Sequence, residues 1–428
     1  MSAPPQATPA ALSGNRNYQV LWVSQVLSGV GLSAAVIAFP LLVLALTGSA
    51  AASGLVLGAI AAAQLLAGLP AGALADRWDR KTIMLGCEAA QVLAAGSLVA
   101  ALWWDAAHLA HLVAVAVVMG VCAALFRPAE DACLPRVVPA QQLPTAVALN
   151  AARGSVAQLA GTAAGGFLFA AGRFVPFAAD AVAHAVACVL LVFLRVPPRE
   201  APPQPVGHLG RQITAGLRWV WGQRHIRVTA ICAVGLNLFF SAFYLIVIVL
   251  AQSRGVPSGQ IGVMAAMLGV GGLVGALLAA RLSARLSPYV SIIAVFWVLA
   301  VLTPVAAVLS NGVLLGVLFA VMALLPPTAN TTIITRQLLL TPDELRGRQS
   351  SVLTILAGVA ASLGPVLGGL LVSAVSGTAA VLVCAAGLTA AALVATLSPT
   401  LRSFPRHPAT PPPESSPVDP VKGEQSNG

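Results

Sequence analysis

Apolar runs of about 20 residues, the length at which a helix crosses roughly 30 Å of hydrocarbon, recur along nearly the whole chain. Only 8% of the 428 residues are charged and 58% are hydrophobic, so the chain cannot cover itself with the polar surface of a soluble protein. The sequence therefore predicts an all-α membrane protein, for which the bilayer is the solvent over most of the chain.

Hydropathy predicts twelve membrane helices in two bundles of six. Their expected ranges are 18–46, 52–75, 82–103, 107–128, 146–171, 174–195, 228–251, 260–281, 289–309, 312–335, 349–374 and 378–397. The expected domains are an N-terminal tail (1–17), a first bundle (18–195), a linker (196–227), a second bundle (228–397) and a C-terminal tail (398–428). We expect the C-terminal tail to be disordered, because it is polar, Pro-rich and without apolar periodicity.

The basic residues indicate the orientation in the membrane. An even number of helices places both termini on one side, and of the 23 Lys and Arg only Arg173 and Arg254 fall toward the other side. Because basic loops stay in the cytoplasm, we expect a multi-pass protein of the plasma (inner) membrane with both termini and the linker cytoplasmic. The linker segment from Arg218 to Arg227 is expected to form a short interfacial helix.

The composition also argues against other classes of protein. A net charge of +10 suggests a nucleic-acid partner for a soluble protein, but a bundle that cannot face water is a poor nucleic-acid binder. The six cysteines form no CxxC pair, so we expect neither a metal site nor disulfides. Neither a phosphate-binding glycine loop nor a catalytic motif occurs, so we expect no enzyme and no cofactor. The expected partners of this monomer are a small-molecule substrate, protons and the lipid bilayer.

The two predicted bundles contain an internal repeat, which indicates a duplicated, pseudo-symmetric architecture. Glycines recur with the same spacing in the fifth and the eleventh predicted helices, where small residues allow helices to pack closely. The two copies are Gly161, Gly165 and Gly166 in the fifth helix, and Gly364, Pro365 and Gly368 in the eleventh.

The loop between the second and third helices reads Gly72-Ala-Leu-Ala-Asp76-Arg77-Trp-Asp79-Arg80-Lys81. It resembles the corresponding loop signature of the major facilitator superfamily, with Asp79 in place of the second glycine. The resemblance implies the major facilitator fold, in which the acid, here Asp76, meets the start of the eleventh helix near 346–350 and latches the outward-open state. A basic loop that only fixes topology is the alternative.

Three further segments are similar to one bacterial branch of this superfamily, which contains enterobactin-type siderophore exporters and macrolide efflux pumps. The resemblance implies that the protein exports its substrate. The segments are Phe126-Arg-Pro128-Ala-Glu130, Leu149-Asn150-Ala-Ala-Arg153 and Pro342-Asp-Glu-Leu-Arg346-Gly347-Arg348.

Proton coupling requires a titratable group inside the membrane, where ionisable residues are costly and functional by default. Glu88 lies about 10 Å into the third helix, at 1.5 Å per residue from Lys81. Asp180 and His184 are four residues apart on one face of the sixth helix, so they can exchange a proton. A hydrogen bond that serves only packing is the alternative for the Asp180 and His184 pair.

The other charged residues near the membrane interior have competing interpretations. Arg153 enters the fifth helix to a depth similar to that of Glu88, so an ion pair between these two is one open arrangement, provided that their helices are adjacent. Glu130 and Asp131 follow Arg127 at the inner end of the fourth helix, where we interpret them as interfacial charge pairs.

In the resembled fold, helices 1, 4, 7 and 10 line the central cavity. We expect substrate contacts from Gln25 in the first helix, from Asn237, Phe240 and Tyr244 in the seventh and from Asn330 in the tenth. Aromatic residues that face lipid are the alternative interpretation for the seventh helix. The aromatic cluster favours a partly apolar ligand.

Taken with the resemblance, these features predict a secondary active transporter that exports a small amphipathic organic compound, such as a drug or a secondary metabolite, by proton antiport and alternating access. A proton-coupled importer of a sugar or other nutrient and a membrane scaffold without transport activity are the alternatives.

Overall fold

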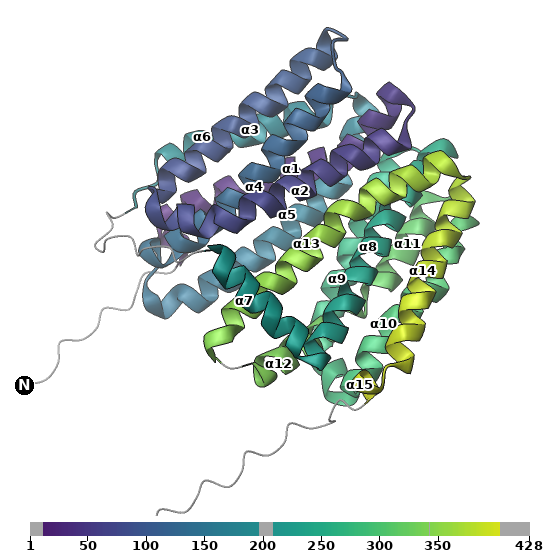
Figure 1. The fold of residues 1–428 in the computed structure, drawn as a ribbon. Helices are drawn as coiled ribbons and strands as arrows, with labels where there is room; N and C mark the ends of the chain where they lie inside the picture. Colours follow the sequence, from purple (N-terminus) through teal and green to yellow (C-terminus); the bar gives the residue numbers. More distant parts are fainter. Residues whose placement is uncertain (1–11, 197–208, 342, 403–428) are drawn as a thin grey trace, which may run out of the picture.

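The computed structural model describes residues 12–196, 209–341 and 343–402. Within these ranges, twelve helices are long and apolar enough to cross a membrane, which confirms the predicted all-α membrane fold. The first six form one bundle and the last six form another, seen in Figure 1 as the purple-to-blue and the green-to-yellow halves.

The helices of the first half are α1 (Arg16–Thr47), α2 (Ala50–Arg77), α3 (Arg80–Trp103), α4 (Leu109–Val137), α5 (Leu143–Ala171) and α6 (Val175–Val192). A connecting helix, α7 (Leu209–Gly222), leads to α8 (Arg224–Ser253), α9 (Ser258–Arg285), α10 (Pro288–Leu302), α11 (Gly312–Ala323), α12 (Pro326–Leu340), α13 (Asp343–Ala374), α14 (Gly377–Leu397) and the short α15 (Pro399–Arg402). The tenth span consists of α11 and the first part of α12.

Local chemistry sets where many of these helices begin and end. The side chains of Asn15, Ser49 and Ser376 each accept a hydrogen bond from a first-turn backbone N–H of the following helix. Gly48 ends α1 with a φ of 65°, and Gly255 follows α8 with a φ of 76°. Both turns need the left-handed backbone that glycine adopts without strain, so the two halves turn in the same way after their first helix.

Two elements differ from the sequence-based prediction. The fourth helix does not end at Pro128 but continues to Val137, because Cys133, Leu134 and Val137 remain buried in a hydrophobic cluster of the first half. The predicted interfacial helix at 218–227 is instead α7, which starts earlier and is separated from α8 by the extended residue Gln223. Val220 of α7 packs against Ile226 and Val352, so α7 is anchored to the second half.

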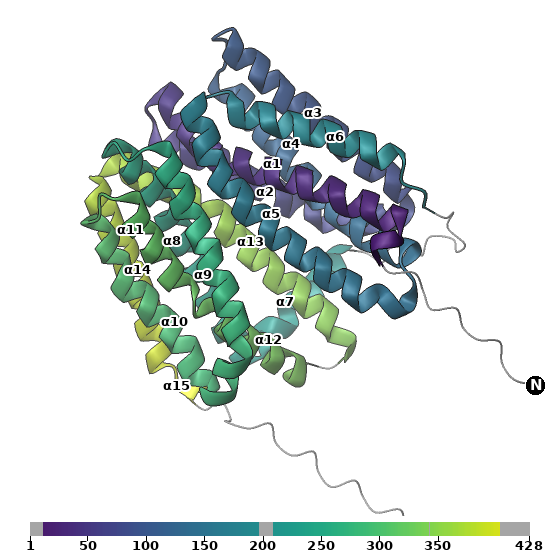
Figure 2. The same cartoon turned by 180° about the vertical axis from the view of Figure 1, so that it is seen from behind.

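The two halves repeat the same packing. In the first, α1 packs against α5 and α6, and in the second the equivalent α8 packs against α13 and α14. The halves meet along α2 with α13 and along α5 with α9 (Figures 1 and 2). We call the end of the molecule that holds the turns at Gly48 and Gly255 the closed end. The end that holds the start of α1, α7 and α15 we call the open end.

The repeated glycines lie at equivalent helix contacts. Gly165 of α5 packs on Ala34 of α1, and Gly368 of α13 packs on Ala242 of α8. Gly161 and Gly364 make the same type of contact one turn away, against Val30 and Leu238. At each of these positions the helix backbones are too close to admit a Cβ atom.

The next glycine in each copy packs across the interface between the halves. Gly166 of α5 faces Gly262 of α9, and Gly369 of α13 faces Ala50 of α2. The backbone carbonyl of Pro365 also lies directly against Gly54 of α2. These contacts bring the two halves into close contact at the closed end.

The α1–α5 contact predicts the effect of Gly165→Ala. Its new Cβ would lie 2.5 Å from the carbonyl oxygen of Ala34, so α5 must move away from α1. Overpacking of this kind costs about 1–3 kcal/mol, and we expect a lower thermal unfolding midpoint for the purified protein. The matched control is Gly96→Ala on α3, where the new Cβ meets no atom within 4 Å. Equal midpoints for the two variants would contradict the proposed tight contact.

Candidate functional site

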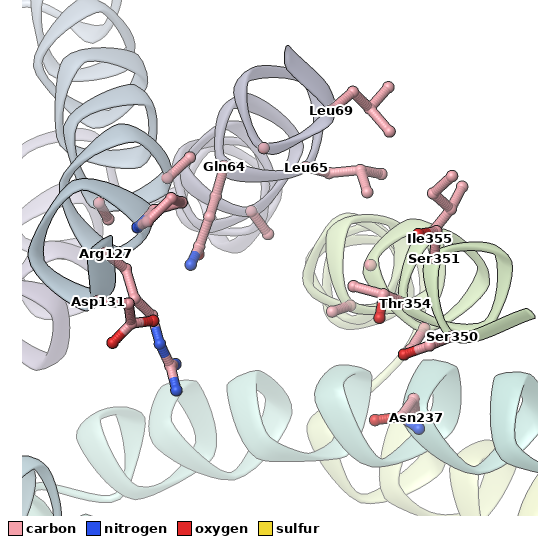
Figure 3. A pocket seen from close by; sticks show the side chains of 18 of the residues that line it. Gln64, Leu65, Leu69, Arg127, Asp131, Asn237, Ser350, Ser351, Thr354 and Ile355 are labelled. Atoms are coloured by element: carbon pink, nitrogen blue, oxygen red, sulfur yellow. The ribbon is translucent and has the colours of Figure 1, made fainter. Parts of the chain in front are cut away.

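A cavity of about 1360 Å³ lies between the two halves (Figure 3). Its walls come from α2 and α4 of the first half and from α8 and α13 of the second. The polar and charged lining residues are Gln64, Arg127, Asp131, Asn237, Ser350, Ser351 and Thr354. A concave site of this size, mostly apolar with a few polar groups, is typical of small-molecule binding.

The cavity widens toward the open end because α2 and α13 diverge there. They are in contact at Gly54 with Pro365, and Leu65 still packs against Gly358. Beyond that point Leu69 of α2 and Ser350 of α13 line opposite sides of the cavity (Figure 3). The protein is therefore closed at one end and accessible from the other.

The first half contributes charge to this cavity and the second half contributes hydroxyl groups. Arg127 and Asp131 are exposed on α4, and they face Ser350 and Thr354 of α13 across the space (Figure 3). These two residues are not the interfacial charge pairs that the sequence favours. The useful signal was their position on the fourth helix, one of the helices already expected to line the cavity.

A second cavity of about 610 Å³ lies inside the second half, among α8, α10 and α12. Most of its lining is apolar, including Phe240, and Asn330 lies on its wall. Asn237 lines both cavities, so the two spaces adjoin at this residue. Tyr244 lines neither of them and instead packs edge-on against Phe319, with ring centroids 5.8 Å apart.

Gln25, expected to contact substrate, has a different position. Its side-chain Nε2 donates a hydrogen bond of 3.2 Å to Oε1 of Glu88 on α3, and it does not line either cavity. The residue faces the interior of the first half because α1 packs between the cavity-lining helices and α6. Knowing that the first helix lines the cavity does not tell which of its faces carries Gln25.

Glu88, His184 and Asp180 form a cluster in the interior of the first half, each about 1% exposed. Oε2 of Glu88 lies 2.5 Å from Nδ1 of His184, and Oδ1 of Asp180 lies 3.2 Å from Nε2 of the same ring. The second contact is within ion-pair range but is not aligned as a hydrogen bond, which leaves Oδ1 of Asp180 without a hydrogen-bond donor among the described residues. The structure thus joins the predicted pair of Asp180 and His184 to Glu88, a residue predicted independently of them.

A glycine of α1 makes room for this cluster. A Cβ at Gly31 would lie 2.9 Å from Oδ1 of Asp180 and 3.0 Å from its Cα. The sixth helix therefore presents its carboxylate directly against the backbone of α1. Together with the hydrogen bond from Gln25, this contact connects the buried cluster to α1 at two points.

Arg153 does not pair with Glu88, so the open arrangement that joined these two residues is wrong. Its Nη2 lies 2.7 Å from Oε1 of Glu130 on α4, and the two side chains are 10% and 9% exposed. The physical reason is helix adjacency: α3 packs mainly against α4 and α6, whereas Arg153 on α5 reaches the inner part of α4. Glu130 is thus in a buried ion pair rather than an interfacial one.

The loop between α2 and α3 is held mainly within the first half. Nη1 of Arg80 donates to the carbonyl of Ala132 at 2.7 Å, and Nζ of Lys81 donates to the carbonyls of Val192 and Leu194 at the end of α6. Asp79, which replaces the family glycine, caps α3 by accepting a hydrogen bond from the backbone of Thr82.

The residues of the expected latch are only partly described. Asp76 lies in the last turn of α2, but its side chain lies outside the described part, as does that of Arg348 on α13. Arg77 is exposed, and Gly72 faces no atom within 4 Å of its would-be Cβ. In this state Leu69 of α2 and Ser350 of α13, which precede and follow the residues that the latch would join, line opposite sides of the cavity.

The Glu130 and Arg153 pair predicts strong energetic coupling. Removing one partner of a buried ion pair costs about 3–5 kcal/mol, so Glu130→Gln and Arg153→Gln should each destabilise the protein, and the double variant should lose much less than their sum. Urea unfolding of the four proteins measures this. The control cycle combines Glu88→Gln with Arg153→Gln, which should be additive. Coupling in the control cycle instead would support the discarded Glu88 and Arg153 pair.

Comparisons with known proteins agree with this architecture. The profile of a family described as transmembrane secretion effector (MFS_3) matches residues 7–423, and no curated protein sequence matches. A crystal structure of the nucleoside transporter NupG has a TM-score of 0.72 at 12% identity, covering 91% of this chain and 100% of that one.

Two other solved structures share the fold. A bacterial homologue of the human lysosomal transporter Spinster, in an inward-facing and unoccupied conformation, has a TM-score of 0.71 at 16% identity, covering 91% of this chain and 98% of that one. A D-xylose–proton symporter has a TM-score of 0.64 at 15% identity with the same coverages. At such low identity these similarities show the fold alone. The family is shown by the profile, which matches nearly the whole chain. The chain therefore belongs to the transmembrane secretion effector family of the major facilitator superfamily, and it is a multi-pass membrane transporter.

Proposed function

We propose that this protein is a secondary active exporter of a small amphipathic organic compound, which it exchanges for protons. The observation that carries the proposal is the cluster of Glu88, His184 and Asp180, which is buried inside the first half. The transporter around it has a central cavity that opens at one end. Ionisable groups at such depth are expensive, and in membrane proteins they mark ion and proton pathways.

Charge accounting supports a proton-binding role for this cluster. With both carboxylates ionised and the imidazole protonated, the cluster has a net charge of −1, although each of its three residues is only 1% exposed. One further proton makes it neutral, which lowers the cost of burial. Oδ1 of Asp180, which has no hydrogen-bond donor among the described residues, is the atom at which we place this proton.

Coupling between proton and substrate requires that the cluster act on a moving element. Helix α1 meets the cluster at Gln25 and at Gly31, and its far end packs against α8 of the other half. A change in the charge of Asp180 therefore acts on a helix that contacts both halves. Alternating access then follows from rocking of the two bundles, as in other transporters built from repeats.

An amphipathic substrate fits the two adjoining cavities. The central cavity offers charged and hydroxyl groups, whereas the second offers an apolar lining beside Phe240. Asn237 lies on the wall of both, so one ligand can place its polar part in the first space and its apolar part in the second. Asn330 lies at the edge of the apolar space, where we propose that it contacts or gates the ligand.

The proposed direction is outward. The family description as a secretion effector and the motifs that resemble siderophore and macrolide exporters both favour export. Because the basic loops lie at the open end together with the start of α1, we place that end in the cytoplasm of a cell with a plasma (inner) membrane. The structure would then represent the inward-open state, ready to load substrate.

The experiment that tests this function is an efflux screen. Cells with and without the protein are loaded with chemically diverse amphipathic compounds, and retention is measured in energised cells. We expect lower retention of one compound class in cells that make the protein. Higher accumulation of a nutrient instead would favour an importer, and no difference for any compound, together with no transport in sealed vesicles, would favour a scaffold.

Proteoliposomes then test coupling. Asp180→Asn and Glu88→Gln should retain downhill exchange but lose accumulation driven by a pH gradient, because each removes a proton-binding group from the cluster. Since Glu88 is free of Arg153, we expect both variants to uncouple. The control is Asp105→Asn in the turn after α3, an exposed site with a φ of 51° that asparagine also adopts. Full gradient-driven transport by both variants would exclude this cluster as the coupling site.

We also propose that Asp76 latches the opposite, outward-open state by meeting the start of α13. An acid near the N-terminus of a helix is attracted by its unpaired N–H groups and dipole. Asp76→Asn should therefore reduce transport strongly at equal expression. Asp79→Asn should be tolerated, because asparagine caps a helix as well as aspartate does. Equal transport rates for the two variants would mean that the loop is only a topology signal.

A further inference from the structure

Arg127 and Asp131 are opposite charges placed one helical turn apart on the wall of the central cavity. We propose that they form a recognition site for a substrate headgroup that carries an anionic and a cationic group a few ångströms apart, a zwitterion. This inference rests on the proposed transport function and adds the chemical class of the headgroup.

The two side chains are available to a ligand. Both are exposed and project from α4 into the cavity (Figure 3), and among the described residues neither takes part in a hydrogen bond or an ion pair within 4.0 Å. In contrast, Glu130, one residue before Asp131, is turned away from the cavity and paired with Arg153. The face of α4 that carries Glu130 is thus neutralised inside the protein, whereas the neighbouring face presents Arg127 and Asp131 to the cavity.

The spacing selects the type of headgroup. Side chains four residues apart on a helix have Cβ atoms roughly 5–6 Å apart, which brings two opposite charges within reach of one small headgroup. A singly charged ligand gains attraction from one of the two residues and repulsion from the other. A ligand with both charges, oriented antiparallel to the pair, gains from both, and a guanidinium binds a carboxylate with two parallel hydrogen bonds.

Arg127 and Asp131 on α4 are the charged residues among those that line the cavity. Across the cavity, Asn237, Ser350 and Thr354 offer neutral polar groups that can accept or donate hydrogen bonds to the rest of the ligand. The other lining residues of this cavity are uncharged. An apolar body attached to the headgroup can then extend toward the second cavity past Asn237.

The test uses the full-length protein in lipid nanodiscs and a matched series with one indole body. Tryptophan is the zwitterion, tryptophan methyl ester is the cation and indole-3-propionate is the anion. Isothermal titration calorimetry should show that wild type binds tryptophan about tenfold more tightly than either analogue, as expected for one additional hydrogen bond to a charged group. Absence of this preference in the wild type would overturn the proposal.

Substitutions assign the preference to the two residues. Arg127→Gln should abolish the advantage of tryptophan over its ester, and Asp131→Asn should abolish its advantage over indole-3-propionate. Arg127→Lys, which keeps the charge, should retain a weakened preference. The exchanged double variant, Arg127→Asp with Asp131→Arg, should restore it. The control is Arg285→Gln at the end of α9, an exposed arginine that does not line the cavity.

The competing role for these residues is a gate that meets α13 when the open end closes. In that case the single variants would change transport rates while the order of binding of the three probes stays that of the wild type, which would overturn recognition. The binding test of the zwitterion preference and the efflux test of the proposed function can succeed or fail independently. A protein that shows the zwitterion preference but no efflux contradicts export alone, and an exporter without the preference contradicts this inference alone.

Discussion

Close approach of helix backbones at glycines is the constraint on which the arrangement of this protein depends. Inside a bilayer no hydrophobic force distinguishes one apolar helix face from another, so helices associate where small residues let them approach. Gly161 and Gly165 fix α5 on α1, and Gly364 and Gly368 fix α13 on α8. The next glycine in each copy, Gly166 or Gly369, belongs to the contact between the halves. The same short pattern therefore builds each bundle and joins the two at the closed end.

With the halves joined at one end only, the molecule has room for a cavity at the other. Charged side chains inside the first half differ in their surroundings from those that face the cavity. Inside the first half, Glu130 is neutralised by Arg153, whereas the single imidazole of His184 lies between the two carboxylates of Glu88 and Asp180. Arg127 and Asp131 face the cavity instead, where their side chains are exposed. The two buried groups have different consequences, because the fully paired charges of Glu130 and Arg153 stabilise one structure, whereas the incompletely paired cluster around His184 can respond to protons.

The cluster of Glu88, His184 and Asp180 illustrates how far residue chemistry can be predicted before positions are known. Each residue was identified from its depth in a predicted helix, because an ionisable group inside the membrane needs an explanation. The pairing of Asp180 with His184 followed from their spacing on one helix, but their contact with Glu88 was not predictable, since it requires α3 and α6 to pack side by side. The ion pair between Glu88 and Arg153, left open by the sequence, does not form for the same reason, and Gln25 was assigned to the cavity although it faces Glu88.

The sequence by itself determined the class of protein, the twelve spans and the duplication, because these depend on local hydropathy and on spacing along the chain. The interpretation of Arg127 and Asp131, by contrast, was wrong. Asp131 and Glu130 are adjacent acids on α4, yet Asp131 lines the cavity and Glu130 pairs with Arg153. Which face meets a partner helix, and which one meets the cavity, is decided by tertiary packing. The reason is physical: hydropathy measures how a segment interacts with the bilayer, whereas contacts between segments depend on shapes that only the assembled bundles bring together.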